Sequence, residues 1–147
     1  MIQRKQTLFL LMAVVLTVIC MSTRLATLVS QGIPFGYLYN LWVTNGQGQH
    51  AFTSAPLFVV LLLSALLSLT TIFLYTKRKL QASMCLLIIV LNIIWYVLLA
   101  VMPQLTGGEM VLEWPAVLPA ISIILSFMAR KGILADEKLV RSLDRIR

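Results

Sequence analysis

Long apolar runs dominate this chain, and four of them are long enough to be transmembrane helices. A helix needs about 20 predominantly apolar residues to cross a lipid bilayer. Runs of that length are found at residues 7–29, 56–76, 82–102 and 110–130. The second and third contain no charged residue, whereas the first includes Arg24 and the fourth includes Glu113 and ends at Arg130. The pattern predicts four membrane-spanning helices.

The segment between the first two runs, residues 30–55, is the longest polar stretch and has a pattern of its own. From Tyr37 to Val43, aromatic and β-branched residues alternate, and Asn45-Gly46 follows, a dipeptide that favours a type I′ turn. A return strand at residues 47–53 would complete a small β-hairpin. The alternative is an aromatic belt at the membrane surface, made of Tyr37, Tyr39 and Trp42 without any sheet. The sequence leaves both interpretations open.

The tail after the fourth run, residues 131–147, predicts an amphipathic helix. Its apolar residues are spaced i, i+1, i+4 and i+7, which places them on one stripe: Leu139, Val140, Leu143 and Ile146. Gly132 is expected to separate this helix from the fourth span. Because a helix of this length is marginal in water, the stripe, with Arg141 and Arg145, is predicted to dock on a partner protein or on the membrane surface.

Composition supports lipid as the solvent of most of the chain. Among its 147 residues, 60% are hydrophobic and 12% are charged, whereas a soluble domain has about 25% charged residues. The length allows a single domain over residues 1–147. The predicted fold class is therefore all-α: a polytopic membrane protein of four helices, with the external hairpin and the tail helix as additions.

Basic residues set the expected orientation. Of the twelve Lys and Arg, only Arg24 lies near the loops at residues 30–55 and 103–110, which contain none themselves. The others precede the first span, form the turn Lys77-Arg78-Lys79, or follow the fourth span. Cytoplasmic loops carry the excess of basic residues, so both termini are expected in the cytoplasm. Clustering beside apolar runs also argues against a nucleic-acid partner.

Polar residues inside the spans are the first place to look for function. Asn92 lies at the middle of the third span, where an interhelical hydrogen bond is the simplest role. Close helix packing is expected at serines with small-xxx-small spacing: Ser64 and Ser68 in the second span, and Ser122 and Ser126 in the fourth. Arg24 is predicted to form a structural ion pair with Glu109 or Glu113 at the external end.

Several kinds of chemistry are excluded by missing residues. His50 is the only histidine, which excludes bis-histidine haem ligation and zinc sites built from several His or Cys. Cys20 and Cys85 lie in separate spans and are expected to be buried apolar residues. No glycine-rich phosphate loop is present. We therefore expect no catalytic, cofactor-binding or metal-binding residues, and no enzyme.

Three blocks of sequence resemble a known family. They are residues 1–8 (MIQRKQTL), residues 71–81 (TIFLYTKRKLQ) and residues 136–147 (DEKLVRSLDRIR). These blocks are similar to an uncharacterised four-helix inner-membrane family of Bacteroidota, a domain of unknown function. The resemblance implies a phylum and a topology, and it implies no activity.

Together these features predict a small non-enzymatic membrane protein, an accessory, assembly or scaffolding subunit of an inner-membrane complex. Its expected partners are the lipid bilayer and another membrane protein or complex, and a homo-oligomer stays open. The alternative is an oligomeric transporter or channel element for a small solute. A pore is expected to place polar residues along a continuous helix stripe, whereas Asn92 stands alone on its helix.

Overall fold

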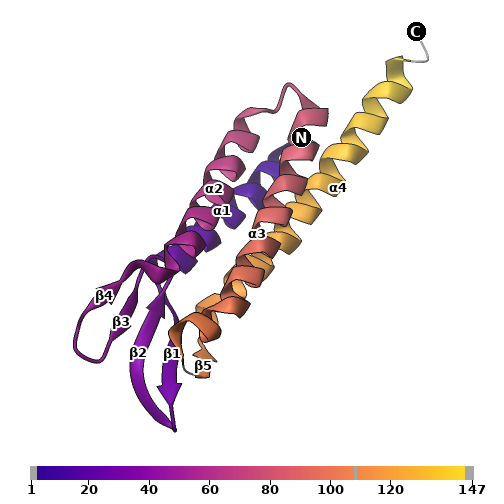
Figure 1. The fold of residues 1–147 in the computed structure, drawn as a ribbon. Coiled ribbons are helices and arrows are strands. Elements are labelled where there is room, and N and C mark those ends of the chain that lie inside the picture. Colours follow the sequence, from indigo (N-terminus) through magenta and orange to yellow (C-terminus); the bar gives the residue numbers. More distant parts are fainter. Residues whose placement is uncertain (1–2, 108, 145–147) are drawn as a thin grey trace.

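Four long helices form the body of the molecule. The computed structural model describes residues 3–107 and 109–144. Its helices are α1 (Gln3–Ser22), α2 (Ala55–Phe73), α3 (Arg78–Thr106) and α4 (Leu118–Asp144), and they lie side by side in a bundle (Figure 1). In this bundle α1 contacts α2 and α4, and α3 contacts α2 and α4.

The bundle has the surface of a membrane protein. All four helices are long and apolar enough to cross a membrane. Their outward faces carry exposed large side chains such as Val97 on α3 and Phe127 on α4, which are 60% and 56% exposed. Contiguous exposed apolar surface of this extent is rare on soluble monomers. These helices indicate a multi-pass membrane protein.

A five-stranded antiparallel sheet covers one end of the bundle. Its strands are β1 (Arg24–Ser30), β2 (Ile33–Tyr39), β3 (Val43–Asn45), β4 (His50–Ala51) and β5 (Glu109–Leu112), in the order β4-β3-β2-β1-β5. Short 3₁₀ helices, η1 (Phe52–Ser54) and η2 (Trp114–Val117), lead into α2 and α4. We call this the sheet end of the molecule. The opposite end, with the α2–α3 turn and the end of α4, is the basic end.

This sheet shows that the all-α prediction was wrong. The first apolar run holds both α1 and β1, and the fourth run begins with β5, so the spans expected at 7–29 and 110–130 are each part strand. A short apolar run is consistent with either a helix or a buried strand. The sign of a strand is the turn that follows: at Gln31-Gly32, φ values of 51° and 80° make a two-residue type I′ turn between β1 and β2.

The predicted hairpin exists only in part. β3 pairs with β4 through Val43–Ala51 and Thr44–His50, whereas Tyr37 and Tyr39 belong to β2. In the connecting turn, Gly48 rather than Gly46 takes a positive φ of 75°. Tyr37 and Tyr39 therefore lie in a sheet and Trp42 lies in the connection between β2 and β3, whereas the prediction of a type I′ turn at Asn45-Gly46 was wrong.

The fourth helix is also longer than expected. Gly132 does not end it, because α4 runs without a break from Leu118 to Asp144 and extends beyond the other helices at the basic end (Figure 1). A Cβ on Gly132 would lie 3.1 Å from Cγ of Gln6. The missing side chain therefore allows α1 to approach α4 closely, and the described part of the tail, up to Asp144, belongs to α4 and forms no separate helix.

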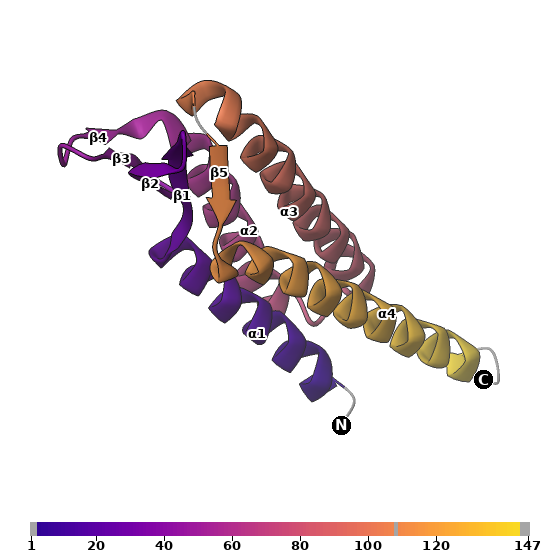
Figure 2. The ribbon, with the colours of Figure 1, turned by 90° about the horizontal axis from the view of Figure 1, so that it is seen from below.

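Two apolar cores hold the structure together. At the sheet end, the inner face of the sheet packs on the helices through Leu25, Leu28 and Leu38 against Leu61 and Trp95. At the basic end, a second core is formed only by helices and includes Leu10, Cys85, Ile88, Ala129 and Ile133. Seen along another axis, β5 lies beside β1 although α2 and α3 separate them in sequence (Figure 2). The sheet thus links the two halves of the bundle.

Candidate functional site on the outer face of the sheet

The face of the sheet that points away from the bundle collects most of the polar and aromatic side chains at this end. Strand alternation places one set of residues inward, where Leu25, Leu28 and Leu38 are fully buried, and the other set outward. We call the second set the outer sheet face: Arg24, Thr27, Tyr37, Tyr39, Thr44, His50, Val111 and Glu113, with Trp42 from the β2–β3 connection. Register brings these together from three segments of the chain.

Arg24 lies at the centre of a set of contacts on this face. Its Nε lies 2.6 Å from Oε1 of Glu113, and Oγ1 of Thr27 donates to the same carboxylate oxygen at 2.9 Å. The guanidinium carbon stands 4.7 Å from the centre of the Tyr37 ring, a cation–π distance. The hydrogen bond that Arg24 donates to Glu113 raises the pKa of Arg24, so this cation keeps its charge throughout the accessible pH range. Of the two carboxylates considered from the sequence, Glu113 makes the pair, and Glu109 is exposed on β5 opposite Val29.

Aromatic rings continue the face toward β4. The rings of Tyr39 and Trp42 are 5.7 Å apart, and those of Trp42 and His50 are 5.6 Å apart in an edge-to-face arrangement. Nδ1 of His50 lies 3.4 Å from Oγ1 of Thr44 on the neighbouring strand. The histidine is therefore part of a ring cluster, and sequence reasoning did not anticipate that contact because it depends on the strand register.

A buried asparagine supports the face from beneath. Asn40 is fully buried, its Nδ2 donates to the carbonyl oxygen of Cys20 at 2.6 Å, and its Oδ1 accepts from Nε1 of Trp95 at 3.0 Å. It joins the end of α1, the sheet and α3. The sequence offered no signal for this role, because an asparagine in a polar loop is ordinarily exposed.

The polar residues predicted within the spans all lie inside the bundle. Asn92, Ser64, Ser68, Ser122 and Ser126 are at most 1% exposed. Nδ2 of Asn92 donates to Oγ of Ser64 at 2.9 Å, which links α3 to α2. Among the described residues, buried polar atoms without a hydrogen-bond partner include Oδ1 of Asn92, the hydroxyls of Ser122 and Ser126, and Nε of Arg130.

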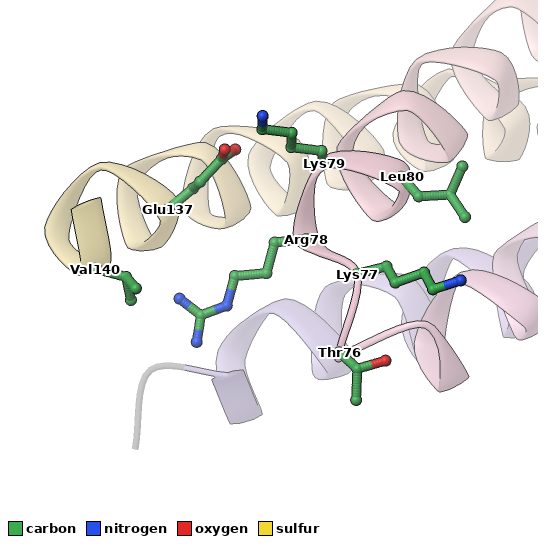
Figure 3. A pocket seen from close by; sticks show the side chains of 7 residues that line it. All are labelled: Thr76, Lys77, Arg78, Lys79, Leu80, Glu137 and Val140. Atoms are coloured by element: carbon green, nitrogen blue, oxygen red, sulfur yellow. The ribbon is translucent and has the colours of Figure 1, made fainter. Parts of the chain in front are cut away.

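The basic end carries a groove between the α2–α3 turn and α4 (Figure 3). It has a volume of about 700 Å³, and a second hollow of about 640 Å³ adjoins it at Lys79 and Glu137. We call the two together the basic groove. It is lined by Thr76, Lys77, Arg78, Lys79, Leu80, Lys131, Leu134, Ala135, Glu137, Lys138 and Val140.

Some of the tail residues predicted to dock on a partner or the membrane lie among the described residues. Leu139 and Val140 are 56% and 42% exposed on the last turns of α4. Arg145 and Ile146 lie outside the described residues, as do the side chains of Arg141 and Leu143.

The cysteines and the possible metal ligands are apart from one another in the part of the chain that the structure describes. Cys20 and Cys85 are both buried free thiols, one in each apolar core. Residues 3–107 and 109–144 contain no group of three or more His, Cys, Asp or Glu side chains placed to hold a metal ion.

Comparison with known proteins gives one family. No curated protein matches the sequence. A family model described as a domain of unknown function, DUF4293, matches residues 2–146, which is nearly the whole chain. The chain belongs to the DUF4293 family.

Proposed function

We propose that this protein is a small non-enzymatic subunit of a membrane protein complex, an accessory, assembly or scaffolding component that binds a partner protein through its outer sheet face. The observation that carries the proposal is the preorganised state of that face. Arg24 is held by Glu113 and Tyr37, and the rings of Tyr39 and Trp42 pack on each other.

The residue types on this face favour a protein partner. Arg, Tyr and Trp are the residues most enriched in the energetically dominant positions of protein interfaces. Side chains already fixed by their neighbours lose less conformational entropy on binding, which favours affinity. Tyr37 is 41% exposed, so its ring remains available for contact while one face covers Arg24. The apolar edge of β5, with Val111 and Leu112 more than half exposed, extends the surface that a partner can cover.

The proposal includes a location and an orientation. We place the protein in a bacterial inner membrane with its basic end in the cytoplasm and its sheet on the other side, because loops rich in Lys and Arg stay cytoplasmic. The turn at Lys77, Arg78 and Lys79 supports this orientation. Reporter fusions at Arg78 should read cytoplasmic, and a fusion at Gly46 should read external. A cytoplasmic signal at Gly46 would overturn the orientation.

The binding role is tested by purification of the full-length protein in a mild detergent, with identification of co-purifying proteins. A Tyr37→Ser/Trp42→Ser variant should bind its partner on the order of several hundredfold more weakly, because two anchor side chains at roughly 2 kcal/mol each are removed. Tyr75→Ser is the matched control, since Tyr75 is an aromatic residue 61% exposed at the opposite end. Equal recovery of the same partner with both variants would refute a role for the outer sheet face.

The end of α4 is the competing docking surface and gives a second arm of the same experiment. A Leu139→Ser/Val140→Ser variant removes the two exposed apolar side chains described there. If the partner is lost with this variant and kept with the outer-face variant, binding occurs at the basic end instead.

The bundle interior favours one second candidate, an oligomeric transporter or channel element. Unpaired buried polar atoms of Asn92, Ser122 and Ser126 lie within membrane-length helices, and such atoms are costly in an apolar surrounding. Proteoliposomes should then swell in glycerol or urea faster than empty liposomes, and Asn92→Leu should abolish the difference. Swelling equal to that of empty liposomes would eliminate this candidate for those solutes.

A further inference from the structure

The basic groove has a strong positive charge. Its described lining includes five cationic side chains, Lys77, Arg78, Lys79, Lys131 and Lys138, and a single carboxylate, that of Glu137. Figure 3 shows three of these cationic side chains at the α2–α3 turn: Arg78 and Lys79 lie on the side of α4, which carries Glu137, whereas Lys77 points away from α4. A groove of this charge is electrostatically complementary to an anion.

Hydrogen bonds across the basic end hold the two walls of the groove in place. Nη1 of Arg78 donates to the backbone carbonyl oxygen of Asp136 at 3.3 Å, which ties the start of α3 to α4. Nε2 of Gln6 donates to Oδ2 of the same Asp136 at 2.6 Å, which ties α1 to α4. The groove is thus a preformed feature of the folded chain.

The depth of the groove matches the level of lipid headgroups. It opens where the apolar part of α2 ends at Phe73 and where that of α3 begins near Leu80. Three of its apolar side chains, Leu80, Leu134 and Val140, are 40%, 37% and 42% exposed. Leu80 adjoins the exposed apolar faces of the helices, so the site offers cations to a headgroup and apolar surface to the acyl chains.

We propose that the basic groove binds an anionic phospholipid, with the headgroup phosphate at Lys79, which lines both hollows, and the acyl chains along the helices. Basic pockets between transmembrane helices on the cytoplasmic side are a known form of headgroup recognition. A free phosphate or a soluble nucleotide would use the cations but leave the apolar walls uncovered, so the lipid fits both parts of the lining. This inference does not rest on the partner-binding role of the outer sheet face.

The test compares two lipids with identical acyl chains. Full-length protein, delipidated in detergent, is titrated with dioleoyl phosphatidylglycerol or dioleoyl phosphatidylcholine, and bound lipid is counted by native mass spectrometry. Phosphatidylglycerol should bind at least about tenfold more tightly, and added salt should weaken it. Equal binding of the two lipids would overturn the proposal. So would displacement of phosphatidylglycerol by millimolar inorganic phosphate, which would indicate a small-anion site.

Substitutions at two positions of the groove should change the affinity for phosphatidylglycerol in opposite directions. Lys79→Gln should weaken phosphatidylglycerol binding about fivefold, the effect of one basic residue near an anionic headgroup. Glu137→Gln removes the only carboxylate of the described lining and should strengthen binding. Lys5→Gln is the matched control, since Lys5 is exposed on α1 and does not line the groove. An unchanged or weakened affinity in Glu137→Gln, or equal losses in Lys79→Gln and Lys5→Gln, would refute the assignment.

Discussion

Replacing Asn40 by alanine tests the junction between the sheet and the helices. In the native structure this amide receives a hydrogen bond from Trp95 and donates one to the carbonyl oxygen of Cys20, in a fully buried site. After the substitution the indole N–H has no partner, which costs about 1–3 kcal/mol. The carbonyl of Cys20 keeps a weaker hydrogen bond from Oγ1 of Thr23 at 3.4 Å. Losing the bond from Asn40 to this carbonyl therefore adds only about 1 kcal/mol. The expected destabilisation is about 2–4 kcal/mol.

The assay uses the buried thiol beside this site. In a Cys85→Ser background, Cys20 is the single thiol and is fully buried, so a maleimide pulse labels it only in molecules whose sheet end has opened. Labelling is followed as sodium dodecyl sulfate is added to protein in a mild detergent. Asn40→Ala should open at a lower fraction of dodecyl sulfate than the native chain, whereas Gln49→Ala, which truncates an exposed amide in the turn between β3 and β4, should not.

A double-mutant cycle identifies the interaction responsible. Trp95→Phe alone leaves Oδ1 of Asn40 unpaired and should cost about 1–3 kcal/mol. Adding Trp95→Phe to Asn40→Ala should cost less than it does in the native chain, because the bond is already lost. Two results would show that the hydrogen bonds of Asn40 do not hold the sheet to the bundle. One is an equal dodecyl sulfate midpoint of Cys20 labelling for Asn40→Ala and Gln49→Ala, and the other is strict additivity of the free-energy changes in the cycle.

Three further substitutions test other contacts of the fold. Gly36→Ala would place a Cβ 2.6 Å from the carbonyl oxygen of Thr44, so it should destabilise the sheet end by about 1–3 kcal/mol and more than Gln49→Ala, a change at an exposed side chain; Cys20 labelling measures both. Gly132→Leu should separate α1 from α4 and expose Cys85 to maleimide in a Cys20→Ser background, whereas Gly132→Ala should have a much smaller effect because its Cβ meets only the flexible side chain of Gln6. Tyr96→Phe removes a hydroxyl that donates to the carbonyl of Ala116 at 2.7 Å and accepts from the amide of Ala120 at 3.0 Å, so it should cost about 1–3 kcal/mol; a midpoint equal to that of Tyr75→Phe, a change at an exposed ring, would contradict this.

The helices were predictable from the sequence because their signal is local. A run such as residues 56–76 has the length and hydropathy of a membrane span, and α2 is found at Ala55–Phe73. The sheet was not predictable in the same way, because the apolar residues Leu25, Ala26, Leu28 and Val29 follow α1 after only a short polar interruption. Hydropathy does not distinguish a buried strand from the last turns of a helix, although the structure changes from one to the other at Ser22-Thr23-Arg24.

The candidate site shows the same division between local and distant information. Arg24 and Glu113 could be matched from the sequence because two opposite charges at the same end of a bundle attract each other. The participation of Thr27 and His50 could not be foreseen, since it depends on which residues of β1, β3 and β4 face each other. The prediction that Gly132 separates two helices was wrong. Glycine often ends a helix, but here its missing side chain provides space for Gln6.

The position of β5 has a consequence for how the chain is made. Synthesis proceeds from the N-terminus, so β1 to β4 are complete well before β5, which follows the whole of α2 and α3. Until residues 109–112 arrive, β1 presents an open edge of unpaired amides and carbonyls on the side that β5 will occupy. The last strand therefore completes the sheet only after α3 has been synthesised. A ribosome-stalled or truncated chain that ends before Glu109 would expose an unpaired strand edge, which quality-control proteases and chaperones can recognise.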